Sequence, residues 1–207
     1  MERTAQVPGD RVELYWLPLG AGATVVRFSG KAYERCLAIR DRRPPSALVH
    51  AALEVRCDGQ RYVIEVAPVW DRRAPDRGVV AEGAVGHRWL GRSRWFRYEV
   101  RRWRDGVIPD IAHALGGPRL LGTRHDRVAA VLDLLPDVPT PVWGRDELGT
   151  GDMWNSNAVV AWVLARSGHP VDAINLPDGS RAPGWLAGAA VAARADATAD
   201  QSSARLA

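Results

Sequence analysis

The residues best suited to chemistry lie in one stretch, Gly151–Gly168, where the pattern predicts a polar turn, a short helix and a terminating glycine. Ser156 stands at the start of that helix, between Asn155 and Asn157. A serine there could act as a nucleophile, because backbone N–H groups at a helix N-terminus stabilise developing negative charge. The same position is typical of a helix cap, and either Ser156 or Asn155 fits that structural role.

A serine nucleophile needs a base to accept its proton, and His50 is a candidate. His50 lies in a predicted β-hairpin whose turn, Asp58-Gly59, is a dipeptide typical of two-residue turns. Alternation along the two strands places His50 and Glu65 on the same polar face, as diagonal neighbours. The set therefore predicts Ser156 as nucleophile, His50 as base and Glu65 as the group that orients the imidazole. The alternative is that His50 is an ordinary strand residue and that Glu65 is only its cross-strand partner.

These groups must be positioned by the surrounding elements, which the sequence pattern predicts. Strands are predicted at Arg11–Leu19, Ala23–Phe28, Ala47–Cys57, Gln60–Pro68, Gly78–Val85, Trp95–Trp103 and Gly188–Ala193. Helices are predicted at Lys31–Arg42, Pro109–Leu115, Asp126–Leu135 and from Ser156 onward. In the last helix Val159, Val160, Val163 and Leu164 share one stripe, which must be buried. Strands that do not alternate regularly with helices favour an α+β fold, with an antiparallel sheet packed against a core helix.

Length and composition narrow the class of protein. A chain of 207 residues with 46% hydrophobic content predicts one domain, 1–191, and the Ala- and Asp-rich segment 192–207 predicts a disordered tail. Cys36 and Cys57 are too few for a disulfide framework, and no Cys/His spacing is typical of zinc, so neither metal nor cofactor is predicted. Without a signal peptide or a membrane-length apolar run, we expect a cytoplasmic protein with no membrane span. Nothing in the sequence specifies an oligomeric state.

The Asn155-Ser156-Asn157 motif and the apolar helix after it follow far behind a histidine-bearing strand, Val49–Val55. This arrangement resembles the circularly permuted papain-like superfamily, which includes NlpC-type peptidases and lecithin:retinol acyltransferase-like enzymes. Trp154 before the motif and the later Leu176-Pro177 are similar to uncharacterised bacterial proteins with a Pro-Asn-Ser-Asn-Thr-Phe signature. The resemblance implies a permuted papain-like fold and an amide or ester hydrolase or acyltransferase.

The chain departs from the superfamily in carrying Ser156 where the nucleophilic cysteine usually stands. A thiol becomes a thiolate readily beside an imidazolium, whereas a hydroxyl must lose its proton during the reaction itself. The alternative is therefore a catalytically inactive domain of the same fold that binds a peptide or acyl ligand. In either case the predicted pocket lies between His50 and Ser156. It would be lined by Asp152, Trp154, Asn155, Asn157 and Glu65.

A third hypothesis concerns arginines interleaved with aromatic residues between Arg88 and Arg104. Such a segment could stack bases and contact the phosphates of a nucleic acid. The alternative is a strand whose arginines pair with Glu99 and Asp105, and we favour it because Lys31 is the only lysine and arginine is used throughout the chain. Tryptophans are predicted in the core or in pocket walls at Trp16, Trp89, Trp95, Trp154 and Trp162.

Overall fold

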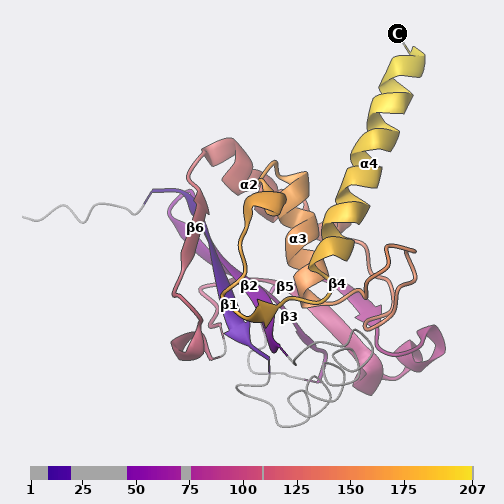
Figure 1. Cartoon of the computed structure of the whole chain (residues 1–207), viewed down its shortest axis with the longest axis horizontal. Coiled ribbons are helices and arrows are strands. Elements are labelled where there is room, and N and C mark those ends of the chain that lie inside the picture. Colours follow the sequence, from indigo (N-terminus) through magenta and orange to yellow (C-terminus); the bar gives the residue numbers. More distant parts are fainter. Residues whose placement is uncertain (1–8, 20–45, 71–75, 109, 207) are drawn as a thin grey trace, which may run out of the picture.

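The structure of the chain, a computed structural model, describes residues 9–19, 46–70, 76–108 and 110–206 (Figure 1). The predicted strand Ala23–Phe28 and helix Lys31–Arg42 lie outside these residues. The strands are β1 (Arg11–Pro18), β2 (Ala47–Cys57), β3 (Gln60–Pro68), β4 (Val79–Ala84), β5 (Arg97–Arg104), β6 (Arg119–Gly122) and β7 (Ser180–Arg181). The α-helices are α2 (His125–Asp133), α3 (Ser156–Arg166) and α4 (Trp185–Leu206), and the 3-10 turns are η1 (Arg88–Arg92), η2 (Arg94–Phe96), η3 (Ile111–His113), η4 (Leu135–Asp137) and η5 (Val171–Ala173).

The strands form a sheet in the order β4-β5-β3-β2-β1-β6, in which all neighbours are antiparallel. The short β7 pairs in parallel with the first residues of β2. Helices α2, α3 and α4 pack together on one face of this sheet (Figure 1). The described residues therefore confirm the predicted α+β class and the antiparallel sheet with a helix packed against it.

The β2–β3 hairpin has the register that the sequence predicts. Cys57 pairs with Gln60 across a turn in which Asp58 and Gly59 both have positive φ, 51° and 73°. Two consecutive positive φ values define the turn type that suits the twist of a hairpin. The pairing ends at Leu53↔Ile64, however, and the first half of β2 separates from β3, so the predicted diagonal pairing of His50 with Glu65 is wrong.

The helices cover the apolar face of the hairpin, which carries Val49, Ala51, Leu53 and Val55. Helix α3 lies at the centre, and every residue from Ser156 to Leu164 is buried. The predicted apolar stripe is thus buried, but the opposite side of α3 is buried as well, because α4 packs against it. The two helices approach so closely that a Cβ at Gly188 would overlap the backbone of Ala158.

Helix α4 replaces two features that the sequence predicted separately. The predicted strand at Gly188–Ala193 is wrong, since small residues here let the chain pack as a helix on α3. The segment predicted as a disordered tail from Ala192 continues the same helix as far as Leu206. Its last turns extend away from the rest of the protein (Figure 1).

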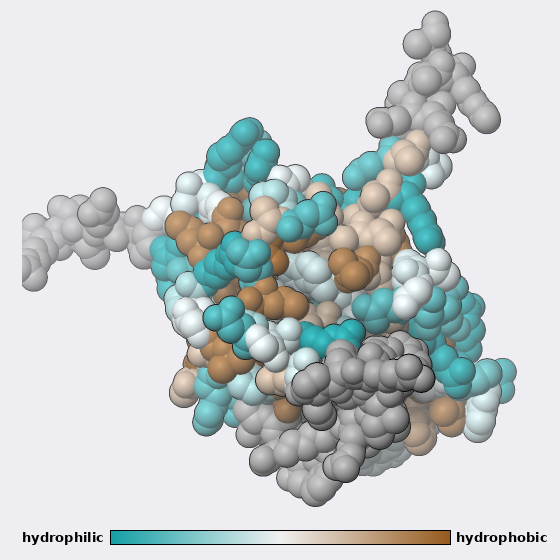
Figure 2. Space-filling model, viewed as in Figure 1, coloured by the Kyte–Doolittle hydropathy of each residue, from teal (hydrophilic) through white to brown (hydrophobic). Residues whose placement is uncertain are grey.

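Among the described residues on the face drawn in Figure 2, apolar patches alternate with polar ones. Of the helices within the described ranges, not one combines the length and apolar character needed to cross a membrane.

Candidate functional site

The first turn of α3 is capped by Asn155, which is one of the two capping residues that the sequence allowed. Its backbone is extended, and its side-chain oxygen accepts hydrogen bonds from the N–H groups of Asn157 (2.9 Å) and Ala158 (3.3 Å). Its side-chain amide donates to the carbonyl of Pro183, 2.8 Å away. Ser156 is therefore the first helical residue rather than the cap, and two N–H groups of the helix start are already occupied.

Asn157 joins the helix start to the strand that carries His50. Its side-chain oxygen accepts from the N–H of Ala51 at 2.7 Å, and its side-chain nitrogen donates to the carbonyl of Val49 at 3.0 Å. The same nitrogen donates to the carbonyl of Pro183 at 2.9 Å. Asn157 thus forms the hydrogen bonds to β2 that a neighbouring strand would form, at the part of β2 from which β3 has separated.

Ser156 and His50 are brought into neighbouring segments by this contact, since His50 lies between the two residues that Asn157 holds. Helix α3, however, packs on the face of β2 that carries Val49 and Ala51. Because side chains alternate along a strand, His50 belongs to the other face. Ser156 is 7% exposed. The helix therefore packs on the apolar face of the hairpin, not on the polar face that the predicted triad required.

Glu65 is engaged in a buried cluster of charges on that polar face. Arg101, which is 1% exposed, donates to Glu65 across 2.7 Å and also pairs with Glu99. Arg77 holds the same Glu99 from the adjoining loop. Buried charges are tolerated only when they are paired in this way. The carboxylate predicted to orient His50 is therefore a partner of Arg101.

The His50 imidazole lies in surroundings that favour its neutral form. Burial lowers the pKa of His50 to about 4, and the negative charge of Asp110 opposes this shift in part. Asp110 precedes η3 in a left-handed conformation, with φ at 59°. Sequence reasoning missed this acidic neighbour, because only the packing of η3 against β1 brings it near the sheet.

Asp152 and Trp154 support the helix start from outside. The Asp152 carboxylate accepts from the N–H groups of Met153 (2.8 Å) and Gly184 (2.6 Å), and it ties the loop before α3 to the start of α4. Trp154 is buried at 2% exposure. Its backbone exchanges hydrogen bonds with Gly144 and Arg145 in the preceding loop. Both residues predicted to line a pocket therefore hold loops in place.

The arginine-rich segment is largely paired within the protein. Arg97 pairs with Glu82, Arg101 with Glu99 and Glu65, and Arg102 donates to the carbonyl of Leu132 in α2. Of the tryptophans predicted in the core, Trp16, Trp154 and Trp162 are buried. Trp89 and Trp95 are not: they are 63% and 66% exposed, because they fall in the 3-10 turns after β4 rather than on a strand.

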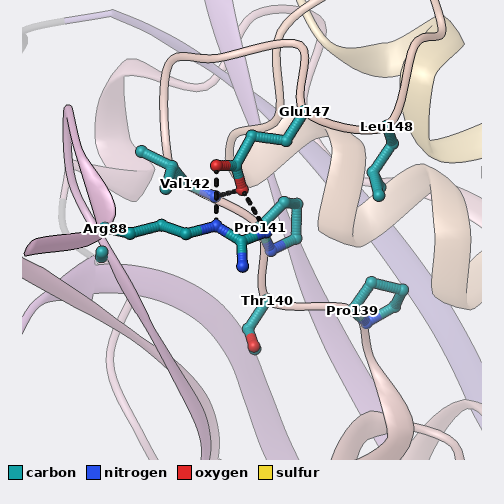
Figure 3. A pocket seen from close by; sticks show the side chains of 8 residues that line it. Arg88, Pro139, Thr140, Pro141, Val142, Glu147 and Leu148 are labelled. Atoms are coloured by element: carbon teal, nitrogen blue, oxygen red, sulfur yellow. Dashed lines mark hydrogen bonds and ion pairs between the residues drawn. The ribbon is translucent and has the colours of Figure 1, made fainter.

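Two adjoining hollows lie beside these turns, with volumes of about 410 and 480 Å³. They share Arg88, Val142 and Glu147, and we call the combined depression the Arg88 groove. In Figure 3 the Arg88 guanidinium meets the Glu147 carboxylate, with N–O distances of 3.0 and 3.3 Å. One end of the groove is lined by apolar or proline side chains at Ala84, Pro139, Pro141 and Leu148. The other end is polar, with His87, Arg145 and Asp146.

Comparison of the chain with models of known protein families, with curated proteins and with solved structures gave no match. The resemblance to permuted papain-like proteins therefore stays a prediction.

Proposed function

We propose that this protein is a ligand-binding domain that carries out no acyl transfer at Ser156. The observation that supports this is the Asn155 cap, which occupies the N–H groups of Asn157 and Ala158. Acyl transfer requires free donors aimed at the developing oxyanion, and a helix start supplies them only while they are unoccupied. A low pKa at His50 also weakens it as a base, since a general base works best near the operating pH.

The Arg88 groove is the ligand site in this proposal. Its apolar end suits a hydrocarbon side chain or a short acyl group. Arg88 suits a carboxylate, because the edge of its guanidinium that does not bond to Glu147 can also donate two parallel hydrogen bonds. Arg88 is 78% exposed on its side chain, so a ligand can reach it while Glu147 stays bonded to the N–H of Val142. The ligand class is therefore a short peptide or N-acyl amino acid with a free carboxylate.

The proposal is tested by NMR titration of the ¹⁵N-labelled chain with N-acetyl-leucyl-leucine. We expect saturable shifts of amides in 139–148, and their loss in Leu148→Arg, which fills the apolar end. Leu120→Arg is the matched control, because Leu120 is 57% exposed on β6 and lies outside the groove. Shifts that are absent, or that persist in Leu148→Arg, would contradict the groove as the site.

A serine hydrolase or acyltransferase is the second candidate, and the Asn157 contact favours it. Asn157 bonds to the residues on both sides of His50, so the segments that carry nucleophile and base touch one another. A fluorophosphonate probe distinguishes the two functions. Labelling that is abolished by Ser156→Ala and retained in Ser93→Ala would support the enzyme and overturn the binding proposal. No labelling of the folded wild type supports the binding domain.

A further inference from the structure

Four side chains with metal-binding atoms converge at the end of the sheet opposite the Asn157 contact. Asp10 precedes β1, Cys57 and Asp58 form the end of β2 and its turn, and His125 begins α2. One ligand atom from each, a carboxylate oxygen, Sγ or an imidazole nitrogen, lies within 4.8 Å of all the others. These residues come from three separate parts of the chain, and none of them has a part in the groove or the start of α3.

The contacts among the four groups hold their ligand atoms close to one another. His125 Nδ1 lies 2.6 Å from Asp10 Oδ2 and 3.8 Å from Asp58 Oδ1, and Cys57 Sγ lies 3.7 Å from Asp58 Oδ2. The backbone N–H of Asp58 donates to the other oxygen of Asp10 at 3.0 Å. A hydrogen bond to the far side of a ligating carboxylate is a common way of fixing its orientation at a metal centre.

We propose that Asp10, Cys57, Asp58 and His125 bind a divalent transition-metal ion of the zinc class. Four ligands at zinc distances, 2.0–2.3 Å, are about 3.3–3.8 Å from one another in a tetrahedron. Two of the separations above, 3.7 and 3.8 Å, lie in this range, and the third, 2.6 Å, is shorter. The shortest, between His125 and Asp10, would lengthen when the ion takes the place of the shared proton.

The donor set decides the class of ion. A thiolate with an imidazole and carboxylates suits zinc, cobalt or copper, whereas calcium and magnesium prefer oxygen ligands alone. Cys57 is buried and fixed by the hairpin, while the side chains of His125 and Asp58 are 59% and 77% exposed. The two exposed ligands can therefore adjust around a fixed one. The bound ion would fasten the segment before β1 and the start of α2 to the hairpin turn.

Cobalt(II) added to the untagged, EDTA-treated full chain tests the site, because a thiolate ligand gives a sulfur-to-cobalt absorption band in the near ultraviolet. We expect this band in the wild type and in Cys36→Ser, and its loss in Cys57→Ser. Zinc should displace the cobalt and raise the melting temperature. No band, or a band that disappears in Cys36→Ser, would overturn the proposal.

The imidazole and carboxylate ligands are tested with variants at exposed positions, which leave the hairpin intact. His125→Ala and Asp58→Asn should each weaken zinc binding at least about tenfold in competition with a chelating dye. His87→Ala is the matched control and should bind like the wild type, since His87 lies in the groove. Equal affinity in His125→Ala and His87→Ala would contradict the four-ligand site, even if the thiol bound cobalt.

Discussion

Replacing Asn157 tests the contact that joins α3 to the sheet. The side chain is 2% exposed and makes three hydrogen bonds, to the N–H of Ala51 and to the carbonyls of Val49 and Pro183. Asn157→Ala leaves the N–H of Ala51 and the carbonyl of Val49 without a partner, whereas the carbonyl of Pro183 keeps its bond from Asn155. Each of these two unpaired groups costs about 1–3 kcal/mol, so we expect a total loss of about 2–6 kcal/mol.

Urea titration followed by tryptophan fluorescence measures this loss, since the chain contains nine tryptophans. The melting temperature should fall by about 10 °C for a chain of this size. Asn155→Asp is the matched control: it keeps the capping oxygen and loses only one bond, to Pro183, so it should cost about 1 kcal/mol.

Hydrogen exchange shows whether the loss of stability arises at the contact between Asn157 and β2. The amide of Ala51 should exchange faster in Asn157→Ala relative to amides in the β2–β3 hairpin, because its acceptor has been removed. The reasoning is refuted if Asn157→Ala unfolds at the same urea concentration as Asn155→Asp, or if the Ala51 amide keeps its relative protection.

Three further predictions concern the buried charges around Arg101, the contact between α3 and α4, and His50. Arg101→Met should cost about 3–5 kcal/mol in urea unfolding, because it removes the buried cation that Glu65 and Glu99 share. A loss under 1 kcal/mol would contradict this. Gly188→Val should lower the melting temperature by several degrees, since its side chain overlaps the backbone of α3, and an unchanged value would mean that the helices can separate at little cost. Burial lowers the pKa of His50 from about 6.5 to about 4. Between these pH values the folded chain binds fewer protons than the unfolded chain. The free energy of unfolding should therefore fall as pH falls through this range, by up to about 1.4 kcal/mol per pH unit. In His50→Gln this part of the pH dependence should disappear from urea midpoints measured between pH 4 and 7.

The sequence predicts those features that depend on neighbouring residues. The Asp58-Gly59 turn fixes the hairpin register, because both residues adopt positive φ without help from elsewhere. The cap of α3 is equally local, since Asn155 bonds to N–H groups two and three residues later. The strand at Arg97–Arg104 follows from alternation of apolar and charged residues within a single segment.

Features that depend on distant residues could not be predicted in the same way. Alternation assigns His50 to one face of β2, but only the packed structure determines which face α3 covers. The proposed metal ligands Asp10, Cys57, Asp58 and His125 have no sequence spacing typical of a metal site, because three separate segments supply them. Ser180–Arg181 is too short for a strand pattern, and only its pairing with β2 defines it.

The separation of β2 from β3 has a consequence for synthesis of the chain on the ribosome. The backbone groups of Val49 and Ala51 find their partner only when Asn157 emerges, 106 residues after Ala51. At about 5–20 residues per second, this strand edge waits roughly 5–20 s for its partner. During that interval it is an open template onto which another nascent chain could add a strand. Arrival of the helix start therefore closes the interval in which this strand edge is open to such pairing.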